Sequence, residues 1–301
     1  MKSLLAVAIL TFTSSLALAE TKVTVAPKSA RPGDAILVTV TGAKELPKGD
    51  AGGTKLQFFR ARNGRYQAVF AVPVGAKDEA VSVEIESAKL PARVAVRTVT
   101  FPDAKVVVEE EFANPPAAER TRIDEDNQAI LAAMAKSDGM EPAFAAPFRR
   151  PLGKVTSMFG EWRTFNDGHR SQHLGMDVHA KEGARVSASN AGTVTLIRDT
   201  FLAGNIVVIA HGGGIATAYF HLSATTVIEG DVVMAGAELG KAGKTGRATG
   251  PHLHISTRVP GGMVDPASVF RLKLAPAAKP KPAAKPAAKP APAAKPAPAK
   301  P

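Results

Sequence analysis

Short apolar runs separated by turn-forming residues dominate the first third of the chain, and they constrain its fold more than any other feature. Most runs are rich in β-branched or aromatic residues, which favour half-buried strands. The runs are 21–25, 36–40, 55–59, 66–72, 80–85, 93–99 and 105–109. Short strands at this spacing predict an immunoglobulin-like β-sandwich over residues 20–112. No histidine occurs before residue 169, so we interpret this module as a spacer or binding domain.

Two further segments complete the predicted folded part of the chain. Residues 113–142 change character, and Ile123, Ile130, Leu131 and Met134 fall on one helical face, which predicts a linker helix over 117–136. The β pattern returns in residues 143–274, with candidate strands punctuated by glycines. These candidate strands are 184–188, 192–198, 206–211 and 215–221.

Both ends of the chain differ from the rest in composition. Lys2, the apolar run 4–12 and the small-x-small site 17–19 indicate a signal peptide over residues 1–19. The apolar run is too short to favour a membrane anchor, and no later segment approaches spanning length. Residues 275–301 contain only Ala, Pro and Lys, which predicts a disordered cationic tail. We therefore expect an exported protein, periplasmic or extracellular.

The chain of 301 residues has a net charge of +11 and no cysteine. Seven of its basic residues lie in segments 1–19 and 275–301, which leaves about +4 on residues 20–274. The basic tail suits anionic envelope polymers, whereas export and the lack of basic-aromatic interleaving argue against nucleic acid. Without cysteine the chain has neither disulfides nor thiolate ligands, so a metal site must use His, Asp or Glu.

All seven histidines lie between residues 169 and 254. In His173-Leu174-Gly175-Met176-Asp177, two side chains suited to zinc flank a glycine that permits close backbone approach. A surface turn explains this spacing equally well. His252 and His254 point to the same face if they lie on a strand, which suits a metal site, although two chance histidines on an exposed strand are the alternative.

A third element, Tyr219-Phe220-His221-Leu222, ends a run of small and apolar residues. Considered alone, His221 suits a structural role. The order of all these blocks is more informative than any one of them. The blocks are Phe159-Gly160, 163–166, HLGMD at 173–177, NAGTV at 190–194, GNIVVIAHG at 204–212, YFHLS at 219–223, EGDVVMAG at 229–236 and GKTGRATGPHLHIS at 243–256.

From about residue 148 to 270 the chain resembles the lysostaphin-type peptidoglycan metalloendopeptidases. The resemblance implies an open antiparallel β catalytic domain with one Zn²⁺ per chain, held by His173, Asp177 and His254. It also implies that His221 and His252 are catalytic histidines that do not bind the metal.

Two further positions match the family's motif, Arg163 and Asn166, and these are plausible groove residues, with a solvated loop as the alternative. The implied substrate is the peptidoglycan stem peptide, cut in a cross-link whose bond type the sequence leaves open.

Three functions are compatible with these residues. The first is a zinc endopeptidase in which three protein ligands leave one position for water and His252 or His221 handles its proton. The second is a non-catalytic regulator or wall-binding activator of other hydrolases. The complete set of ligands favours the enzyme. The third, a zinc store, does not need two additional histidines. The sequence leaves open whether the segment before residue 150 covers the groove.

Overall fold

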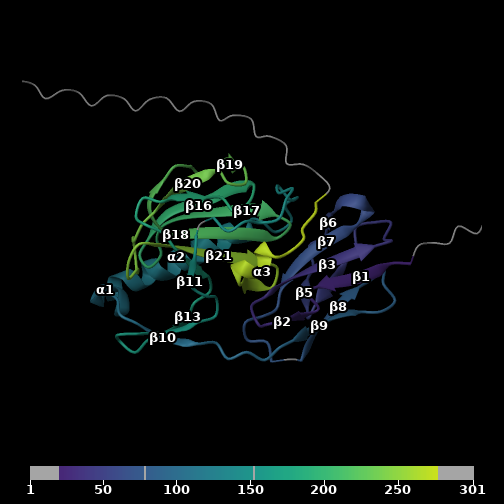
Figure 1. Ribbon diagram of the computed structural model, residues 1–301, viewed down its shortest axis with the longest axis horizontal. Coiled ribbons are helices and arrows are strands. Elements are labelled where there is room, and N and C mark those ends of the chain that lie inside the picture. Colours follow the sequence, from purple (N-terminus) through teal and green to yellow (C-terminus); the bar gives the residue numbers. More distant parts are fainter. Residues whose placement is uncertain (1–19, 78, 152, 277–301) are drawn as a thin grey trace, which may run out of the picture.

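The computed structural model describes residues 20–77, 79–151 and 153–276, and its fold is mainly β, as predicted. The expected signal peptide and residues 277–301 of the expected tail lie outside the described residues. Among the residues described, no helix is long and apolar enough to cross a membrane. Figure 1 shows the N-terminal strands, in purple and blue, beside a larger sheet of green strands.

Two sheets pack face to face in the N-terminal part. Their strand orders are β1-β3-β7-β6 and β2-β9-β8-β4-β5. The strands are β1 (Lys22–Ala26), β2 (Ser29–Ala30), β3 (Ala35–Thr41), β4 (Gly49–Ala51), β5 (Thr54–Lys55), β6 (Phe59–Arg60), β7 (Tyr66–Ala71), β8 (Ala80–Ile85) and β9 (Ala92–Val96), with a short 3₁₀ helix at Arg62–Gly64. Ile36, Val38, Phe70, Val83 and Val94 belong to the shared core. The immunoglobulin-like topology of this sandwich remains a prediction.

Strand β3 is apolar on both faces, and this explains why the sandwich does not stand alone. Its residues Ile36, Val38 and Val40 face the sandwich core. Ala35 and Leu37 alternate with them and belong to a second core that includes residues of the C-terminal domain. Because both faces of the strand are buried, its sheet forms a layer between two apolar cores.

Two predicted sandwich strands differ in the structure. The run 55–59 is not one strand, because the chain passes there from β5 in one sheet to β6 in the other. The run 105–109, predicted as the seventh strand of the sandwich, has a different partner. Here β10 (Asp103–Val106) pairs in parallel with β12 (Trp162–Phe165) of the C-terminal domain. The apolar run specified a strand without specifying its partner.

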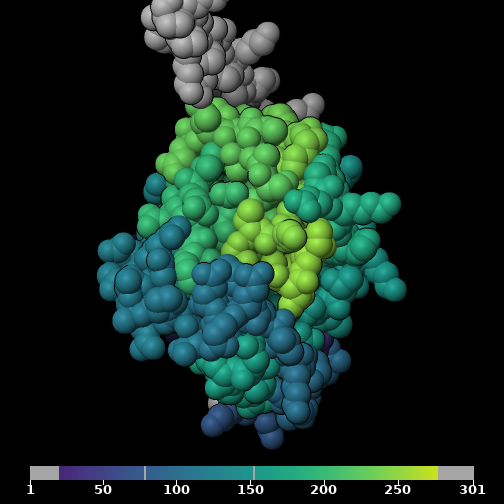
Figure 2. Space-filling model, turned by 90° about the vertical axis from the view of Figure 1, so that its left-hand side faces the viewer, coloured from purple at the N-terminus to yellow at the C-terminus, as the bar shows by residue number. Residues whose placement is uncertain are grey.

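The linker contains α1 (Glu110–Ala113) and α2 (Ala117–Ala135), which matches the predicted helix. Figure 2 shows the linker surface, in blue, against the green surface of the C-terminal domain. The docked face differs from the predicted one: Leu131 is 52% exposed, while Ala133 and Met134 are buried against the sheet. Asp126 explains this choice, since its carboxylate accepts hydrogen bonds from Arg198 Nε at 2.7 Å and Phe201 N at 2.9 Å.

A ten-stranded sheet, antiparallel throughout, forms the C-terminal domain, with the central order β11-β14-β21-β18-β17-β16-β19. Its strands are β11 (Val155–Ser157), β14 (Met176–His179), β15 (Arg185–Ser187), β16 (Gly192–Thr200), β17 (Gly204–Gly212), β18 (Ile215–Thr225), β19 (Val232–Val233), β20 (Glu238–Ala242), β21 (His252–Val259) and β22 (Gly262–Val264). Strands β10, β12 and β13 (Arg170–Gln172) form a small separate sheet, and α3 spans Pro266–Phe270. Val207 and Ile209 face one core of the large sheet, whereas Ile206 and Val208 face α2.

The end of the described chain returns to the sandwich. Ala275 N donates a hydrogen bond to Gln67 Oε1 at 2.9 Å, and Ala275 O accepts one from Arg62 N at 2.9 Å. Pro276 forms a β-bridge with Ala61. The chain therefore stays attached beyond residue 274, the predicted end of the C-terminal domain.

The contact between sandwich and C-terminal domain is centred on aromatic side chains. Phe144 is fully buried, with ring centroids 5.9 Å from Phe59 and 5.2 Å from Phe148. Polar contacts border this core: Arg31 bonds Asp265 at 2.9 Å, and Ala35 N donates to Ser268 Oγ at 2.9 Å. The sandwich thus contributes to the hydrophobic core that supports the large sheet.

We expect Phe144→Ala to destabilise the protein by about 3–5 kcal/mol, because it leaves a cavity between the two parts. Urea unfolding of the chain from residue 20 measures this loss. Leu131→Ala is the control, since that apolar side chain is 52% exposed and its removal should change stability by about 0.5 kcal/mol or less. Equal small effects of both substitutions would contradict a shared core.

Candidate metal centre

A cavity of about 650 Å³ lies where β12, β13, β14, β18 and β21 meet. Its lining includes His173, Asp177, His221, His252 and His254. Val106 on β10, Val108 just after it and Asn127 on α2 also contribute to its wall. The five candidate metal and catalytic residues, spread over 82 positions of the sequence, therefore share one site.

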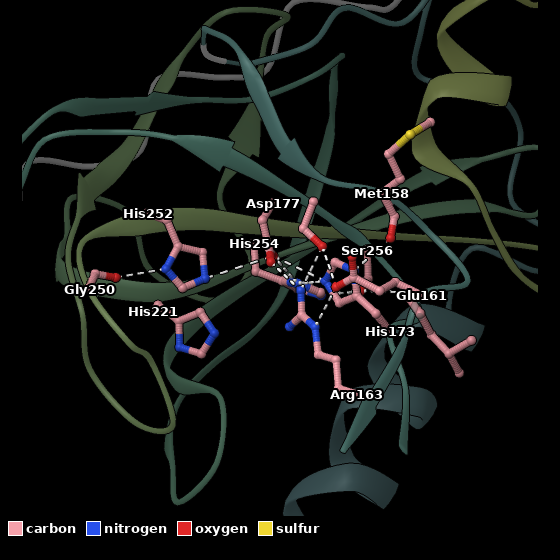
Figure 3. A network of polar contacts seen from close by, with 12 residues as sticks. Met158, Glu161, Arg163, His173, Asp177, His221, Gly250, His252, His254 and Ser256 are labelled. Carbon is pink, nitrogen blue, oxygen red and sulfur yellow. Dashed lines mark hydrogen bonds and ion pairs between the residues drawn. The ribbon is translucent and has the colours of Figure 1, made fainter. Parts of the chain in front are cut away.

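Three of these residues bring a ligand atom each to one point. Asp177 on β14 is paired across the ladder with His254 on β21, and His173 lies on the loop that enters β14. Asp177 Oδ1 lies 3.1 Å from His173 Nε2 and 2.8 Å from His254 Nδ1. The two imidazole nitrogens are 2.9 Å apart. Figure 3 shows this convergence.

Hydrogen bonds on the far side of each ring determine which nitrogen is free. His173 Nδ1 lies 2.9 Å from the Met158 carbonyl oxygen, so it carries the proton and leaves Nε2 with its lone pair. Ser256 Oγ donates to Leu174 O at 2.9 Å and thus accepts from His254 Nε2 at 2.9 Å. His254 Nδ1 is therefore also a lone-pair atom. Such outer partners orient metal-binding histidines.

The surroundings of His254 and Asp177 keep both groups in the protonation states that a metal requires. Burial lowers the pKa of His254 to about 4, so its ring is neutral near pH 7. Burial alone would raise the pKa of Asp177, but the adjacent His173 and His254 rings outweigh that effect and place the pKa well below its usual range. The site thus presents a carboxylate at Asp177 and a neutral imidazole at His254.

The donor set fits a small divalent cation. Without a cation, three electron-rich atoms within 3.1 Å of one another repel. A tetrahedral ion about 2.1 Å from each atom needs ligand separations of about 3.4 Å. An expansion of about 0.5 Å therefore admits the ion, and His with carboxylate ligands suits zinc.

Gly175 permits this close arrangement, as its position between His173 and Asp177 suggested. A Cβ at residue 175 would lie 2.4 Å from the His254 ring and 2.7 Å from Ile255 O. Moving the His254 ring and the Ile255 backbone to make room for a Cβ would disturb the β14–β21 ladder. A side chain at this position is therefore incompatible with the site.

The two remaining histidines line the same cavity beside the ligand atoms. His252 Nδ1 bonds Gly250 O at 2.8 Å, and His221 Nδ1 bonds Thr245 O at 2.8 Å. Each ring therefore keeps Nε2 as a free acceptor, and the ring centroids are 4.8 Å apart. His252 Nε2 lies 3.8 Å from Asp177 Oδ1. Burial, followed by the nearby His252, lowers the pKa of His221 to about 3.

An irregularity in β18 brings His221 to the cavity. His221 has φ 59°, a left-handed conformation that is rare for residues other than glycine. The ladder between β17 and β18 shifts register at the same place, and His221 N bonds Ala203 O at 3.0 Å instead. As a result Phe220 and His221, although consecutive, both line the cavity.

The two predicted groove residues have different surroundings. Arg163 lines the cavity, but its guanidinium bonds Asp177 Oδ2 at 2.5 Å, Ser157 Oγ at 2.9 Å and Glu161 Oε1 at 3.2 Å. It orients the carboxylate through the oxygen that faces away from the imidazoles. Asn166 is not among the cavity residues. Its Oδ1 accepts a hydrogen bond from Val108 N at 3.1 Å, so it holds the segment that follows β10, and its role as a groove residue stays a prediction.

Sequence reasoning missed the residues that orient the rings. Ser256 follows His252 and His254 on the same strand face, so the alternation that paired the histidines also indicated this residue. Met158 and Thr245 act through backbone carbonyls. A carbonyl is present at every residue, so neither position had a recognisable signal.

The segment that contains this site is similar to known proteins. Residues 171–266 match the sequence profile of Peptidase family M23. The DD-carboxypeptidase/endopeptidase Mpg of Neisseria meningitidis is 41% identical over 131 residues, which cover 43% of this chain and 28% of the relative. The peptidoglycan DD-endopeptidase ShyA of Vibrio cholerae is 43% identical over 93 residues, covering 31% and 22% of the two chains. This chain thus spans under a third of either relative.

A solved structure extends the likeness beyond the matched domain. The crystal structure of a Pseudomonas aeruginosa protein assigned to peptidase M23 superposes with a TM-score of 0.58 at 26% identity, covering 79% of this chain and 93% of the other. The resemblance to lysostaphin-type enzymes is thereby confirmed, and residues 171–266 are a domain of peptidase family M23, a family of metallopeptidases.

Proposed function

We propose that this protein is a zinc metalloendopeptidase that hydrolyses peptide cross-links of bacterial peptidoglycan. The observation that carries the proposal is the convergence, in one cavity, of three ligand atoms and two further imidazoles with free Nε2 atoms. His173, Asp177 and His254 would hold one zinc ion per chain. A non-catalytic regulator has no need of this complete arrangement.

Zinc bound by three protein ligands acts as a Lewis acid and lowers the pKa of a bound water to about 7. The residues of the chain determine where the proton goes. His252 Nε2, 3.8 Å from Asp177 Oδ1, is placed to accept a proton beside the ligands. His221 Nε2 is a second acceptor facing the same space, and it would orient the attacking water. Arg163 keeps Asp177 in place through its other oxygen.

The substrate class is proposed from the relatives. Two of them are named as a DD-carboxypeptidase/endopeptidase and a peptidoglycan DD-endopeptidase. We propose the same class of bond here, between D-configured residues of a cross-link. This choice favours the D-alanyl type over a glycine bridge, the two alternatives that the sequence left open.

The proposed location is the cell envelope, periplasmic or extracellular, in keeping with the signal-like segment 1–19 and a peptidoglycan substrate. The six lysines of residues 275–301 would bind anionic envelope polymers by salt-sensitive attraction. Retention on such polymers at low salt should fall when this tail is deleted.

The enzymatic proposal is tested by digestion of purified cross-linked muropeptides. We expect residues 20–301 with one equivalent of zinc to convert cross-linked dimers into monomers. Mass spectrometry of the products identifies the bond, since hydrolysis adds one water between the two stem peptides. Matched reactions use protein stripped of metal by a chelator and then reloaded. Dimers that stay intact with fully loaded protein would refute the proposal.

A further inference from the structure

Arg247 forms part of the cavity wall, on the loop that joins β20 to β21. Its backbone N–H donates to Leu202 O at 2.8 Å, which fixes the start of the side chain. Its guanidinium carbon lies 4.1 Å from the centroid of the Phe165 ring. Phe165 is buried and belongs to β12, so the stacked guanidinium is held at both ends of the side chain.

The donors of this guanidinium have no acceptor among the described residues. Within the part of the chain that the structure describes, Arg247 makes no side-chain hydrogen bond or ion pair. Arg163 in the same wall differs, because it bonds Asp177, Glu161 and Ser157. The donors of this half-buried arginine are therefore available to a ligand that enters the cavity and supplies the acceptor.

The electrostatic surroundings favour an anionic ligand at Arg247. Burial, and then the charge of Arg163, lower the pKa of Arg247, and the charge of Asp167 only partly opposes them. The carboxylates of Asp177 and Glu161 already pair with Arg163. An anion that enters the cavity therefore meets a cation that forms no direct ion pair within the described residues, beside the proposed catalytic centre.

We propose that Arg247 binds a free carboxylate group of the peptide substrate and so selects acidic peptides with a carboxylate near the scissile bond. The inference rests on the proposed endopeptidase function and adds a specificity-determining residue to it. When one face of a planar guanidinium stacks on a ring, the N–H donors at its edge stay available and can donate two parallel hydrogen bonds to a carboxylate. A neutral carboxamide cannot use both donors in this way.

The test compares two forms of one substrate. Cross-linked muropeptides are prepared with their peptide carboxyl groups free or converted one at a time to carboxamides, and kcat and KM are measured with zinc-loaded residues 20–301. For the unmodified enzyme, one amidation should raise KM by about 10- to 100-fold, because a charge-assisted bidentate contact is lost. The kcat should change little, since the contact is made equally in the bound and transition states.

Arg247→Gln should raise KM for the free carboxylate by a similar factor and show no further effect of amidation. Arg247→Lys should retain part of the preference for the free carboxylate, because lysine keeps the positive charge but lacks the two parallel N–H donors of a guanidinium. Arg120→Gln, at an exposed position on α2, is the matched control and should behave as the unmodified enzyme. If Arg247→Gln instead raised KM by the same factor for the free and the amidated substrate, the proposal would be overturned and Arg247 would have a packing role.

Failure of the proposed function has a different signature. If the zinc-loaded protein cleaves neither substrate form, titration calorimetry with both forms still measures binding. Tighter binding of the free carboxylate that disappears in Arg247→Gln supports the subsite even then. Equal affinity for both forms in the unmodified protein contradicts it. Arg247→Gln should leave the zinc content and the unfolding temperature unchanged. These two measurements show that a change in binding is not caused by a loss of folding.

Discussion

Replacing His254 with alanine is expected to weaken zinc binding by more than about 100-fold and to abolish hydrolysis. The substitution removes one of three ligand atoms, and loss of an outer partner alone already costs about 10- to 100-fold in metal affinity. The two remaining ligand atoms, His173 Nε2 and Asp177 Oδ1, lie 3.1 Å apart and leave the ion half open to water. Zinc retained after dialysis against a chelator, measured by elemental analysis, gives the result directly.

Two variants make this measurement specific. Ser256→Ala removes the hydroxyl that accepts from His254 Nε2 and should weaken zinc binding by about 10- to 100-fold, less than loss of the ligand. His169→Ala removes an exposed histidine of the same domain, stacked on Phe165 outside the cavity, and should keep full zinc content. Full zinc content in His254→Ala would show that the ligand assignment is wrong.

The part of the site that lies on regular strands could be predicted from the sequence. Alternation placed His252 and His254 on one face of a strand, with Leu253 and Ile255 opposite, and in β21 those two apolar residues are fully buried. Sequence spacing did not show that Asp177 pairs directly with His254, since register depends on the neighbouring strand. The resemblance to a family supplied that link.

The irregular part could not be predicted from periodicity. His221 reaches the cavity through a left-handed backbone conformation and a register shift in β18, so alternation would have sent either Phe220 or His221 away from it. Gly175 is the exception, because a glycine between two ligands signals close approach. The 2.4 Å that would separate a Cβ at residue 175 from the His254 ring confirms that signal.

At the level of the fold, the sequence did not show which strand each strand pairs with or which face of a helix is buried. The run 105–109 indicated a strand, but β10 pairs with β12 of the C-terminal domain. Helical periodicity included Leu131 in the docked face, whereas the buried Asp126, paired with Arg198, rotates the helix so that Leu131 faces solvent. Both outcomes depend on a surface that forms only when distant segments meet.

Strand β10 and the residues beside it bear on whether the N-terminal part covers the groove. Val106 and Val108 contribute to the cavity wall, and Phe101 lies against Gly160, where a Cβ would meet its ring at 2.1 Å. Gly160 N in turn donates to His173 O at 2.8 Å. The N-terminal part therefore supports the loop of the first ligand, so its removal should impair the site as well as open it.

Replacing His252 with alanine is expected to separate metal binding from catalysis. The three ligand atoms are unchanged, so the protein should retain one equivalent of zinc. Hydrolysis of cross-linked muropeptides should fall by about 100- to 10,000-fold, the usual contribution of a general base. The Nδ1–H of His252 is held by Gly250 O, so its free Nε2 is the proton acceptor that the substitution removes. Zinc content and kcat are measured on the same preparation.

His221→Ala and the double variant complete this test, because the two rings face one space with centroids 4.8 Å apart. If His221 orients the water from which His252 takes the proton, the residues act as a unit, and the double variant should be about as inactive as the single ones. Losses that multiply would mean independent roles, such as a contact of His221 with the substrate. Loss of zinc from His252→Ala would instead make His252 a ligand and return the general base to His221, whose Nε2 is also free.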